Sequence, residues 1–475
     1  MRKHSILLWL VLIAGCASVT REQAGVGGPL GVIGVVPTHL TADYWVRRAP
    51  RPDAVVLDSA EIARQNERLK QIDKSVRDLE QVPTTLAAAD VRAWLEVMSA
   101  RPTRTLFDEQ GREVTARQLD EWRASLNLDA VAPTQATRYG MVVRRADLRT
   151  FPTRARVFSD PEDTDIDRFQ ESALFPGTPV AIAHSSRDGE WLFVISALYS
   201  AWIDASAVAE GGRDRIFAYT HKSPYVVVTG AKAHTVYTPE RPELSNLQLE
   251  MGARVPLLPD WPVETPVNGQ HPYTAHVIEL PYRASDGSLQ FSPALLPKTQ
   301  EVDSDYLPLT RANILHQGFK FLGERYGWGH SYDARDCSGF VSEVYRSFGV
   351  QLPRNTRDQG VSPALDRIEL TEADDHEARV KLLREAQVGD LIYVPGHVMM
   401  VIGHEQGEPY IIHDTTGINF RGGGGDIERA RLNGVSVTPL LPLLLSDGRP
   451  MIDRVYSIQR IRIAADHRRE HHEDY

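Results

Sequence analysis

Residues 326–341 read YGWGHSYDARDCSGFV, a glycine-rich loop that leads into a predicted helix. Phe340 and the apolar residues after it recur at helical spacing, and Gly349 is suited to end the helix. Asp336 is placed as the N-cap, so Cys337 is predicted in the first helical turn, where the helix dipole favours a thiolate over a thiol. A cysteine buried only for packing lies more often in the middle of a helix. Cys337 is therefore the candidate nucleophile.

Two histidines downstream of Cys337 are candidates for its base. The segment 389–403 predicts two buried strands joined by a turn, with His397 at the head of the second, and His413 lies in a third strand. If the last two strands form a hairpin, His397 can face Cys337 while His413 fixes the ring tautomer. Each histidine alone is more often a polar residue without a catalytic role. Their order after a helix-start cysteine favours catalysis.

The N-terminus is typical of a secretory signal. Residues 1–15 carry two basic residues and a short apolar run, too short to span a bilayer, that ends in Ile-Ala-Gly before Cys16. This ending resembles a lipobox, so we expect acylation of Cys16; an ordinary signal peptide or an uncleaved anchor is the alternative. Ala17 favours the outer membrane if the host is Gram-negative. With Cys16 acylated, Cys337 is the only thiol and no intramolecular disulfide can form.

The chain between the two ends divides into regions that differ in composition and in the spacing of their apolar residues. A glycine-rich stretch, 16–37, is predicted to be a flexible tether, and 38–131 a mainly helical domain in which Asp58 and Glu61 form a capping box. Short apolar runs and Asp-Gly turns then predict strands, and the residues of 146–152, 167–172 and 199–202 resemble a bacterial SH3 domain. The predicted domains are a first SH3-like barrel, 138–210, a less regular second one, 215–300, a C-terminal domain, 305–463, and a charged tail, 464–475.

The sequence motifs around the candidate triad resemble those of the NlpC/P60 family of papain-like cell-wall cysteine peptidases. Tyr-x-Trp-Gly, Asp-Cys-Ser-Gly-Phe, Leu-Pro-Arg, Gly-Asp-Leu, Gly-His-Val and a later histidine occur in order over about residues 310–463. The resemblance implies an α+β multidomain protein in which a papain-like domain follows two SH3-like barrels and a helical domain. With these domains the chain resembles γ-D-glutamyl-L-diamino acid endopeptidases, which cut peptidoglycan stem peptides or muropeptides after D-Glu.

The same resemblance implies roles for individual residues. Cys337, His397 and His413 would be the triad, with Tyr326 stabilising the oxyanion. Substrate contacts, including one to the free amine of the L-Ala that precedes D-Glu, would come from the following residues: Asp336, Ser338, Trp328, Asn355 and Thr356.

Two departures from the family pattern bear on substrate recognition. Relatives often have glycine at the position of His330, and Asp-Ser or a similar pair where this chain has Asn355-Thr356. The missing carboxylate weakens the expected recognition of an amine. Glu171 and Tyr199, from the first SH3-like barrel, are candidates to compensate, because relatives use an acid and a tyrosine of that domain to close the site.

Composition excludes several other classes of function. The formal net charge of -10 and the pI near 5.9 give no basic stripe for nucleic acid. Gly422–Gly425 lack the following lysine of a phosphate-binding loop and are expected to form a surface loop. His467, His471 and His472 lie in a charged tail where disorder is favoured over metal capture, and no Cys or His cluster elsewhere has zinc-site spacing. No cofactor and no metal are predicted.

Two other functions remain open on the sequence. The same cysteine and histidines could serve an amidase or acyltransferase acting on wall components, since one fold hosts several chemistries. The chain could also be a wall-binding SH3 scaffold whose catalytic site has decayed, although the complete triad argues against decay.

Overall fold

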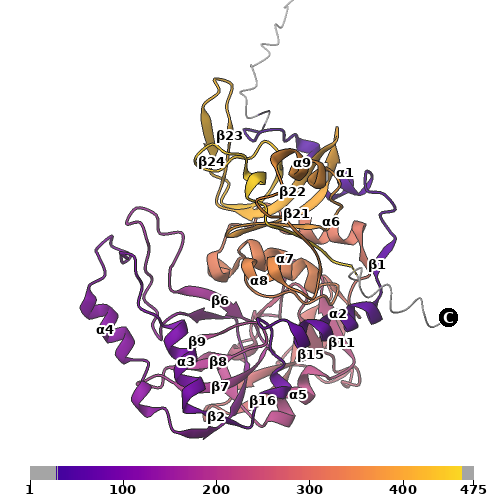
Figure 1. Cartoon of the computed structure of the whole chain (residues 1–475). Helices are drawn as coiled ribbons and strands as arrows, with labels where there is room; N and C mark the ends of the chain where they lie inside the picture. Colours follow the sequence, from indigo (N-terminus) through magenta and orange to yellow (C-terminus); the bar gives the residue numbers. More distant parts are fainter. Residues whose placement is uncertain (1–27, 29, 463–475) are drawn as a thin grey trace, which may run out of the picture.

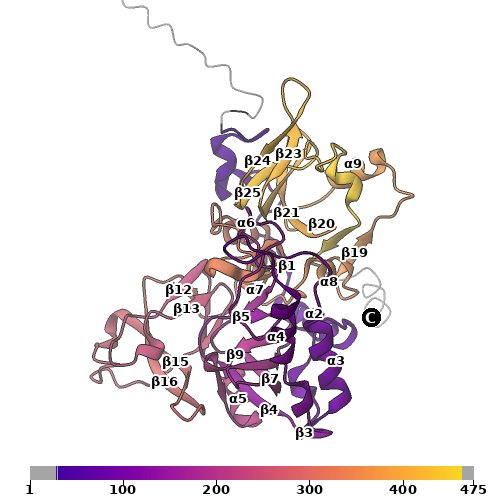
Figure 2. The same cartoon turned by 90° about the vertical axis from the view of Figure 1, so that its left-hand side faces the viewer.

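The structure is a computed structural model and describes residues 28 and 30–462. Figures 1 and 2 place the C-terminal domain at the top and the two barrels below it, with the N-terminal segments running over both. In this described part no helix is long and apolar enough to cross a membrane. The predicted signal, Cys16 and the tail 464–475 lie outside the described residues.

The C-terminal domain is built on a six-stranded antiparallel sheet. Its order is β19 (Asp366–Glu369), β26 (Ser457–Arg460), β20 (Leu391–Val394), β21 (His397–Glu405), β22 (Glu408–Thr415) and β25 (Gly434–Pro439). Alternate residues of β21 and β22 face opposite sides, as a pleated strand requires. One side packs on α6 (Arg311–Phe319) and α7 (Cys337–Arg346), and the other on α9 (His376–Arg384).

Smaller elements complete this domain. The strand β18 (Leu309–Thr310) precedes α6, the 3-10 segment η7 (Trp328–Asp333) precedes α7, and α8 (Thr356–Val361) follows it. The predicted surface loop Gly422–Gly425 is the turn of the hairpin β23 (Ile418–Arg421) and β24 (Ile427–Ala430), at the top of Figure 1.

The first barrel is one seven-stranded sheet. Its order is β10 (Val208–Glu210), β4 (Arg138–Val142), β7 (Pro179–Ser185), β8 (Trp191–Ile195), β9 (Ser200–Asp204), β5 (Ala146–Arg149) and β6 (Gln170–Leu174). The predicted hairpin around Asp188-Gly189 is present as β7 and β8, and Gly189 has a φ of 74° that favours glycine. The edge strand β6 faces the C-terminal domain, where it packs on η7.

The second barrel follows the helix α5 (Arg213–Thr220) and has its own apolar core. Three small sheets surround that core. They are β14 (Arg254–Pro256), β11 (Tyr225–Val228) and β17 (Val302–Asp303); β12 (Lys232–His234) and β13 (Gln248–Glu250); and β15 (Ala275–Arg283) and β16 (Leu289–Pro297). The last pair is the hairpin predicted around Asp286-Gly287.

The N-terminal region, predicted as one helical domain over 38–131, has no core of its own. Its first half belongs to the C-terminal domain: Trp45 of α1 (Ala42–Val46) is fully buried against Tyr410, and β1 (Val55–Leu57) pairs with β18. Its second half covers the first barrel, where Val91 and Leu95 enter the barrel core. The domain prediction is therefore wrong, because helical spacing reveals an apolar face but not the core which that face covers.

The helices of this region are α2 (Ser59–Ile72), α3 (Ala88–Met98) and α4 (Ala116–Ala124), with a short pair β2 (Thr85–Ala87) and β3 (Thr134–Ala136). The capping box predicted at Asp58 and Glu61 is confirmed: each side chain accepts the other's backbone N–H at 2.8 Å. The end of the predicted tether is packed, since Val35 is 2% exposed and Tyr410 donates to the Gly34 carbonyl at 2.6 Å. A flexible tether is thus contradicted at that end.

Candidate active site

Cys337 is the first residue of α7, as predicted, and it is only 5% exposed. Asp336 caps the helix by accepting the Gly339 N–H at 2.8 Å. The sulfur lies 3.6 Å from Thr356 Oγ1, and the backbone N–H of Val398 points at it from the start of β21. The nucleophile therefore sits where the helix N-terminus meets the strand that carries His397.

Burial decides the ionisation of this thiol. Burial, followed by the nearby charge of Asp336, raises the pKa of Cys337 to about 12, although the contacts of the sulfur with Thr356 and Val398 act to lower it. The predicted thiolate is thus not the resting form at neutral pH. A first-turn helix position stabilises an anion, but here it does not compensate for lost hydration and an adjacent carboxylate.

The two predicted histidines meet. His397 opens β21, His413 lies in β22, and His397 Nε2 is 2.9 Å from His413 Nδ1. On its far side His413 Nε2 contacts Thr438 Oγ1 at 3.1 Å. Burial lowers the pKa of His397 to about 4 and that of His413 further below its ordinary value, so both rings are neutral at pH 7. The chain of contacts leaves His397 Nδ1 as the nitrogen available to the thiol.

Tyr326 lies beside the nucleophile and is 8% exposed. Burial and the nearby Cys337 raise the pKa of its phenol. Its hydroxyl is consequently protonated at any physiological pH and can donate a hydrogen bond. Such a neutral donor is what a developing oxyanion requires.

Asp336 is paired with Arg354 in a buried network. Two guanidinium nitrogens donate to its two oxygens at 3.1 and 2.8 Å, and Gly329 N–H and Ser338 Oγ also donate to it at 3.1 Å each. Burial alone would raise the pKa of Asp336, but Arg354, His330 and the Gly339 N–H together outweigh burial and hold it at about 2. Arg354 already compensates the charge of Asp336, which disfavours the predicted pairing of Asp336 with a substrate ammonium.

Arg354 also joins the two domains. Its Nε donates to Ser172 Oγ of the first barrel at 2.6 Å, and it contacts Ser338 Oγ at 2.9 Å and His330 Nδ1 at 2.8 Å. His330 stands at the position where glycine was expected from the family pattern. Burial holds the pKa of this histidine well below its ordinary value. Arg354 is the arginine of the Leu-Pro-Arg motif, which by itself did not indicate a role for this residue.

The barrel edge closes against the loop that precedes the nucleophile. Trp328 Nε1 donates to the Gln170 carbonyl at 3.0 Å, and Gln170 Nε2 donates to the Gly329 carbonyl at 2.8 Å. Next to Gln170, the carboxylate of Glu171 accepts from Tyr199 at 2.5 Å and from Thr150 at 2.6 Å.

The remaining predicted substrate residues lie at the start of α8. Asn355 is its N-cap and is exposed, and its side chain donates to Asp358 at 3.1 Å. Thr356 is half-buried and reaches the Cys337 sulfur. A search of residues 28 and 30–462 finds no group of three or more His, Cys, Asp or Glu side chains that could hold a metal ion.

Comparisons with known proteins agree with this architecture. The NlpC/P60 family profile matches residues 323–431, and the profile of SH3 domains of the SH3b1 type matches 156–204. A γ-D-glutamyl-L-lysine dipeptidyl-peptidase from Bacillus cereus is 25% identical over 225 residues, which is 44% of this chain and 60% of that protein. The chain thus matches less than two thirds of that relative's length.

One solved structure shares the fold. It is described as a novel NlpC/P60 endopeptidase from Photobacterium damselae subsp. piscicida, has a TM-score of 0.70 at 17% identity, and the match covers 87% of this chain and 96% of that one. A Bacillus cereus NlpC/P60 family protein has a TM-score of 0.45 at 20% identity, covering 68% and 99%. The chain therefore carries an NlpC/P60 domain over residues 323–431, with an SH3 domain of the SH3b1 type over residues 156–204 in front of it.

Proposed function

We propose that this protein is a cysteine endopeptidase that hydrolyses the γ-D-glutamyl–diamino acid bond of peptidoglycan stem peptides. The observation that carries the proposal is the arrangement of Cys337 at a helix N-terminus, against the strand whose first residue, His397, is hydrogen-bonded to His413. The relative described as acting on a γ-D-glutamyl-L-lysine bond supports the choice of bond.

The resting site holds a neutral thiol and a neutral imidazole, which fixes the order of proton transfers. Cys337 Sγ attacks the γ-carbonyl carbon of D-Glu while its proton passes to His397, and Tyr326 donates to the oxyanion. His397 then gives the proton to the departing amine of the diamino acid, which leaves a thioester. Water attacks the thioester, and His397 takes a proton from the water and returns one to the sulfur. His413 keeps the His397 ring oriented throughout.

Recognition of a free L-Ala amine falls to Glu171 and Tyr199 in this proposal. Asp336 is paired with Arg354, and Asn355 is uncharged. Glu171 follows Gln170 on the strand that packs against the loop before Cys337, and its carboxylate is only half-buried. The ammonium of the substrate L-Ala would pair with the Glu171 carboxylate, which is the acidic group of the first barrel predicted to contact substrate.

The test uses L-Ala-γ-D-Glu-L-Lys and its meso-diaminopimelate counterpart, each with the alanine amine free or acetylated. Mass spectrometry should find L-Ala-D-Glu and the free diamino acid, with no product from the Cys337→Ala variant. Glu171→Gln should lower kcat/KM on free-amine substrates by about 30- to 100-fold, since a charged hydrogen bond contributes about 2–3 kcal/mol.

The matched control is Glu162→Gln, which changes an exposed carboxylate of the same barrel and should leave kcat/KM unchanged. Acetylated substrates should be cut slowly by the unmodified enzyme and no more slowly by Glu171→Gln. Equal kcat/KM on free and acetylated stems would refute amine recognition. Products from another bond would refute the proposed reaction itself.

We further propose that the protein is exported and anchored in the cell envelope through acylated Cys16, on the outer membrane facing the periplasm in a Gram-negative host. The support is the signal-like sequence before Cys16. Cys16→Ser should abolish acyl labelling and move the protein out of the membrane fraction. Unchanged membrane association without label would contradict the anchor.

A further inference from the structure

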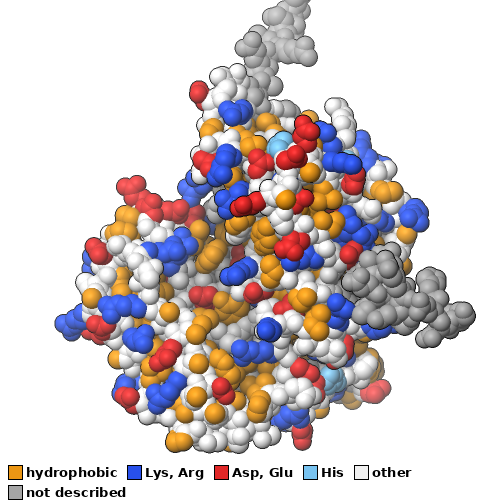
Figure 3. Space-filling view, viewed as in Figure 1, with side chains coloured by type: hydrophobic (Ala, Val, Ile, Leu, Met, Phe, Trp, Pro, Cys, Tyr) orange, Lys and Arg blue, Asp and Glu red, His pale blue; other side chains and the backbone are white. Residues whose placement is uncertain are grey.

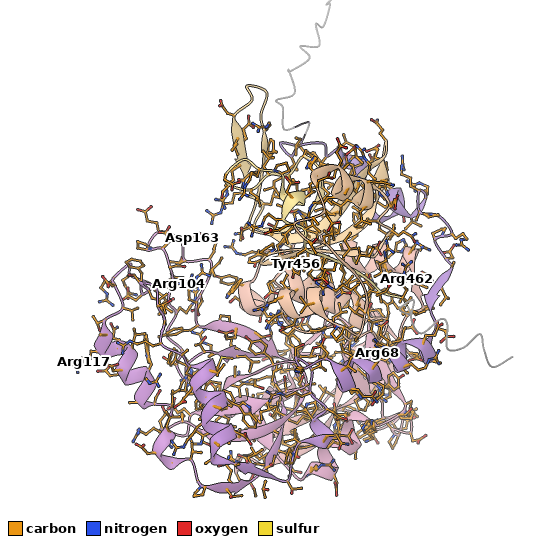
Figure 4. All side chains as sticks on the ribbon, in the orientation of Figure 1. Arg68, Arg104, Arg117, Asp163, Tyr456 and Arg462 are labelled. Carbon is orange, nitrogen blue, oxygen red and sulfur yellow. The ribbon has the colours of Figure 1, made fainter. Side chains whose placement is uncertain are left out.

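A second cavity, of about 510 Å³, lies on the C-terminal domain at the far end of the nucleophile helix. It is bounded by β1, the first residues of α6, the turn before β20 and the end of β26. Tyr345, near the end of α7, lines it, whereas Cys337 begins the same helix. Arg462, at its edge, is labelled in Figure 4 and lies beside the β1 segment seen on the right of Figure 1.

The charge of this cavity differs from that of the chain as a whole. The chain has a formal net charge of -10, and Figure 3 shows acidic and basic side chains interspersed over one face. In the cavity, four arginines oppose two carboxylates. The arginines are Arg51, Arg311, Arg460 and Arg462, and the carboxylates are Glu61 and Asp390.

Several of these guanidinium groups have donors without an acceptor. Arg51 makes no ion pair within residues 28 and 30–462. Arg311 donates through Nη2 to Gln387 at 2.6 Å, but its Nε is buried and unpartnered. Arg460 Nε is also buried without a hydrogen bond, 3.7 Å from Asp390. Buried donors are normally satisfied, so the two unpartnered Nε donors of Arg311 and Arg460, with the exposed Arg51 at the same cavity, indicate an acceptor supplied from outside the protein.

The other cavity walls show what kind of acceptor fits. Leu57 and Ile314 are buried and apolar, and the hydroxyl of Tyr345 already donates to the Gly389 carbonyl. A cavity of this volume exceeds what an inorganic ion needs and is within the range of small-molecule sites. Planar guanidinium forks match the oxygens of phosphate and carboxylate groups.

We propose that this cavity binds a small organic dianion, whose phosphate or paired carboxylate oxygens take the free donors of Arg51, Arg311 and Arg460. The site is separate from the peptidase site and does not depend on the proposed reaction. Its apolar wall receives the carbon skeleton of the ligand, while its excess of arginines over carboxylates selects negative charge.

Isothermal titration calorimetry on the full chain, at about 0.15 M salt to screen nonspecific surface binding, tests the proposal with two probes. Phenyl phosphate represents an organic phosphate, and glutarate a dicarboxylate. Arg51→Gln combined with Arg311→Gln should raise the Kd of the binding probe at least about tenfold. Arg460→Gln should do the same, with a melting measurement to check its fold, because it leaves Asp390 without its nearest cation.

The matched control combines Arg384→Gln and Arg449→Gln, two exposed arginines outside the cavity, and should leave the Kd unchanged. Binding of phenyl phosphate alone identifies a phosphate ligand, and binding of glutarate alone a dicarboxylate. No binding of either probe up to about 10 mM, which is weaker than the millimolar affinity expected of a specific site, would overturn the proposal. So would binding that neither set of cavity variants weakens.

Discussion

Replacing Arg354 with methionine tests how the site is held together. Arg354 is 7% exposed and is the only cation that contacts Asp336 within residues 28 and 30–462. Methionine keeps much of the apolar volume but removes the guanidinium donors to Asp336, Ser338 and Ser172. Asp336 would then be a buried carboxylate without a counter-charge.

The magnitude follows from the ionisation of Asp336. Arg354, with His330 and the Gly339 N–H, lowers the pKa of this carboxyl from 3.8 to about 2 despite burial, which corresponds to about 2.5 kcal/mol of stability at neutral pH. That contribution is fully present above pH 4 and is lost as pH falls toward 2, because the folded pKa lies below the unfolded one. Removing one partner of a buried pair typically costs about 3–5 kcal/mol in total.

In the variant, burial raises the pKa of Asp336 above its ordinary value, so the carboxyl gains a proton as pH falls and becomes less costly to bury. The destabilisation relative to the unmodified protein should therefore be largest near pH 7.5 and smaller near pH 4.5. Asp336→Asn in the Arg354→Met background should recover part of the loss at pH 7.5, since it removes the uncompensated charge.

Differential scanning calorimetry at the two pH values measures these shifts. The control is Arg384→Met, whose exposed ion pair with Glu408 should contribute less than about 1 kcal/mol at either pH. The reasoning is refuted if Arg354→Met is no more destabilising than this control. It is also refuted if the loss is the same at both pH values, because an uncompensated carboxylate must respond to protons.

Three further predictions concern the thiol and the contacts around it. Because burial raises the pKa of Cys337 to about 12, its rate of alkylation by iodoacetamide should rise continuously from about pH 6 to pH 10; a plateau between pH 6 and 8 would indicate a thiolate–imidazolium pair. Gly329→Ala places a Cβ 2.9 Å from Gln170 at a φ of 56°, so kcat/KM on stem peptides should fall at least about tenfold; unchanged kinetics would mean that the barrel contact does not position the loop. Trp45→Ala should cost about 3–5 kcal/mol in thermal unfolding, because the ring is fully buried, and a loss below about 1 kcal/mol would contradict its place in the core.

The arrangement of the candidate catalytic residues could be predicted because their chemistry leaves a local pattern. A capping aspartate, a cysteine in the first turn and an apolar helical face occur within a few residues, and two strand-borne histidines follow. The His397–His413 contact at 2.9 Å was expected from a hairpin, and the structure contains that hairpin. Such patterns depend on spacing within one element or between two neighbours in the chain.

Electrostatic state could not be predicted in the same way. The position of Cys337 favours a thiolate by the helix dipole, but the pKa also depends on how much water reaches the sulfur and on Asp336 beside it. Arg354 lies in another segment of the chain and forms an ion pair with Asp336, and no pattern in the sequence predicts that pairing. Burial and long-range partners are properties of the packed fold, so they enter only with the structure.

The division into domains failed for a related physical reason. The region 38–131 has ordinary helical periodicity, yet Trp45 packs under the C-terminal sheet while Leu95 packs under the first barrel. The periodicity of an amphipathic helix reveals its apolar face but does not indicate which core that face covers. This packing also affects the candidate site. The N-terminal segment contacts both the C-terminal domain and the first barrel. In the site itself, Gln170 of the barrel donates to the loop before Cys337, and Ser172 accepts from Arg354. The candidate site is therefore built from two domains whose relative position is also fixed by packing outside the site, whereas the matched NlpC/P60 profile, which begins at residue 323, covers only one of these domains.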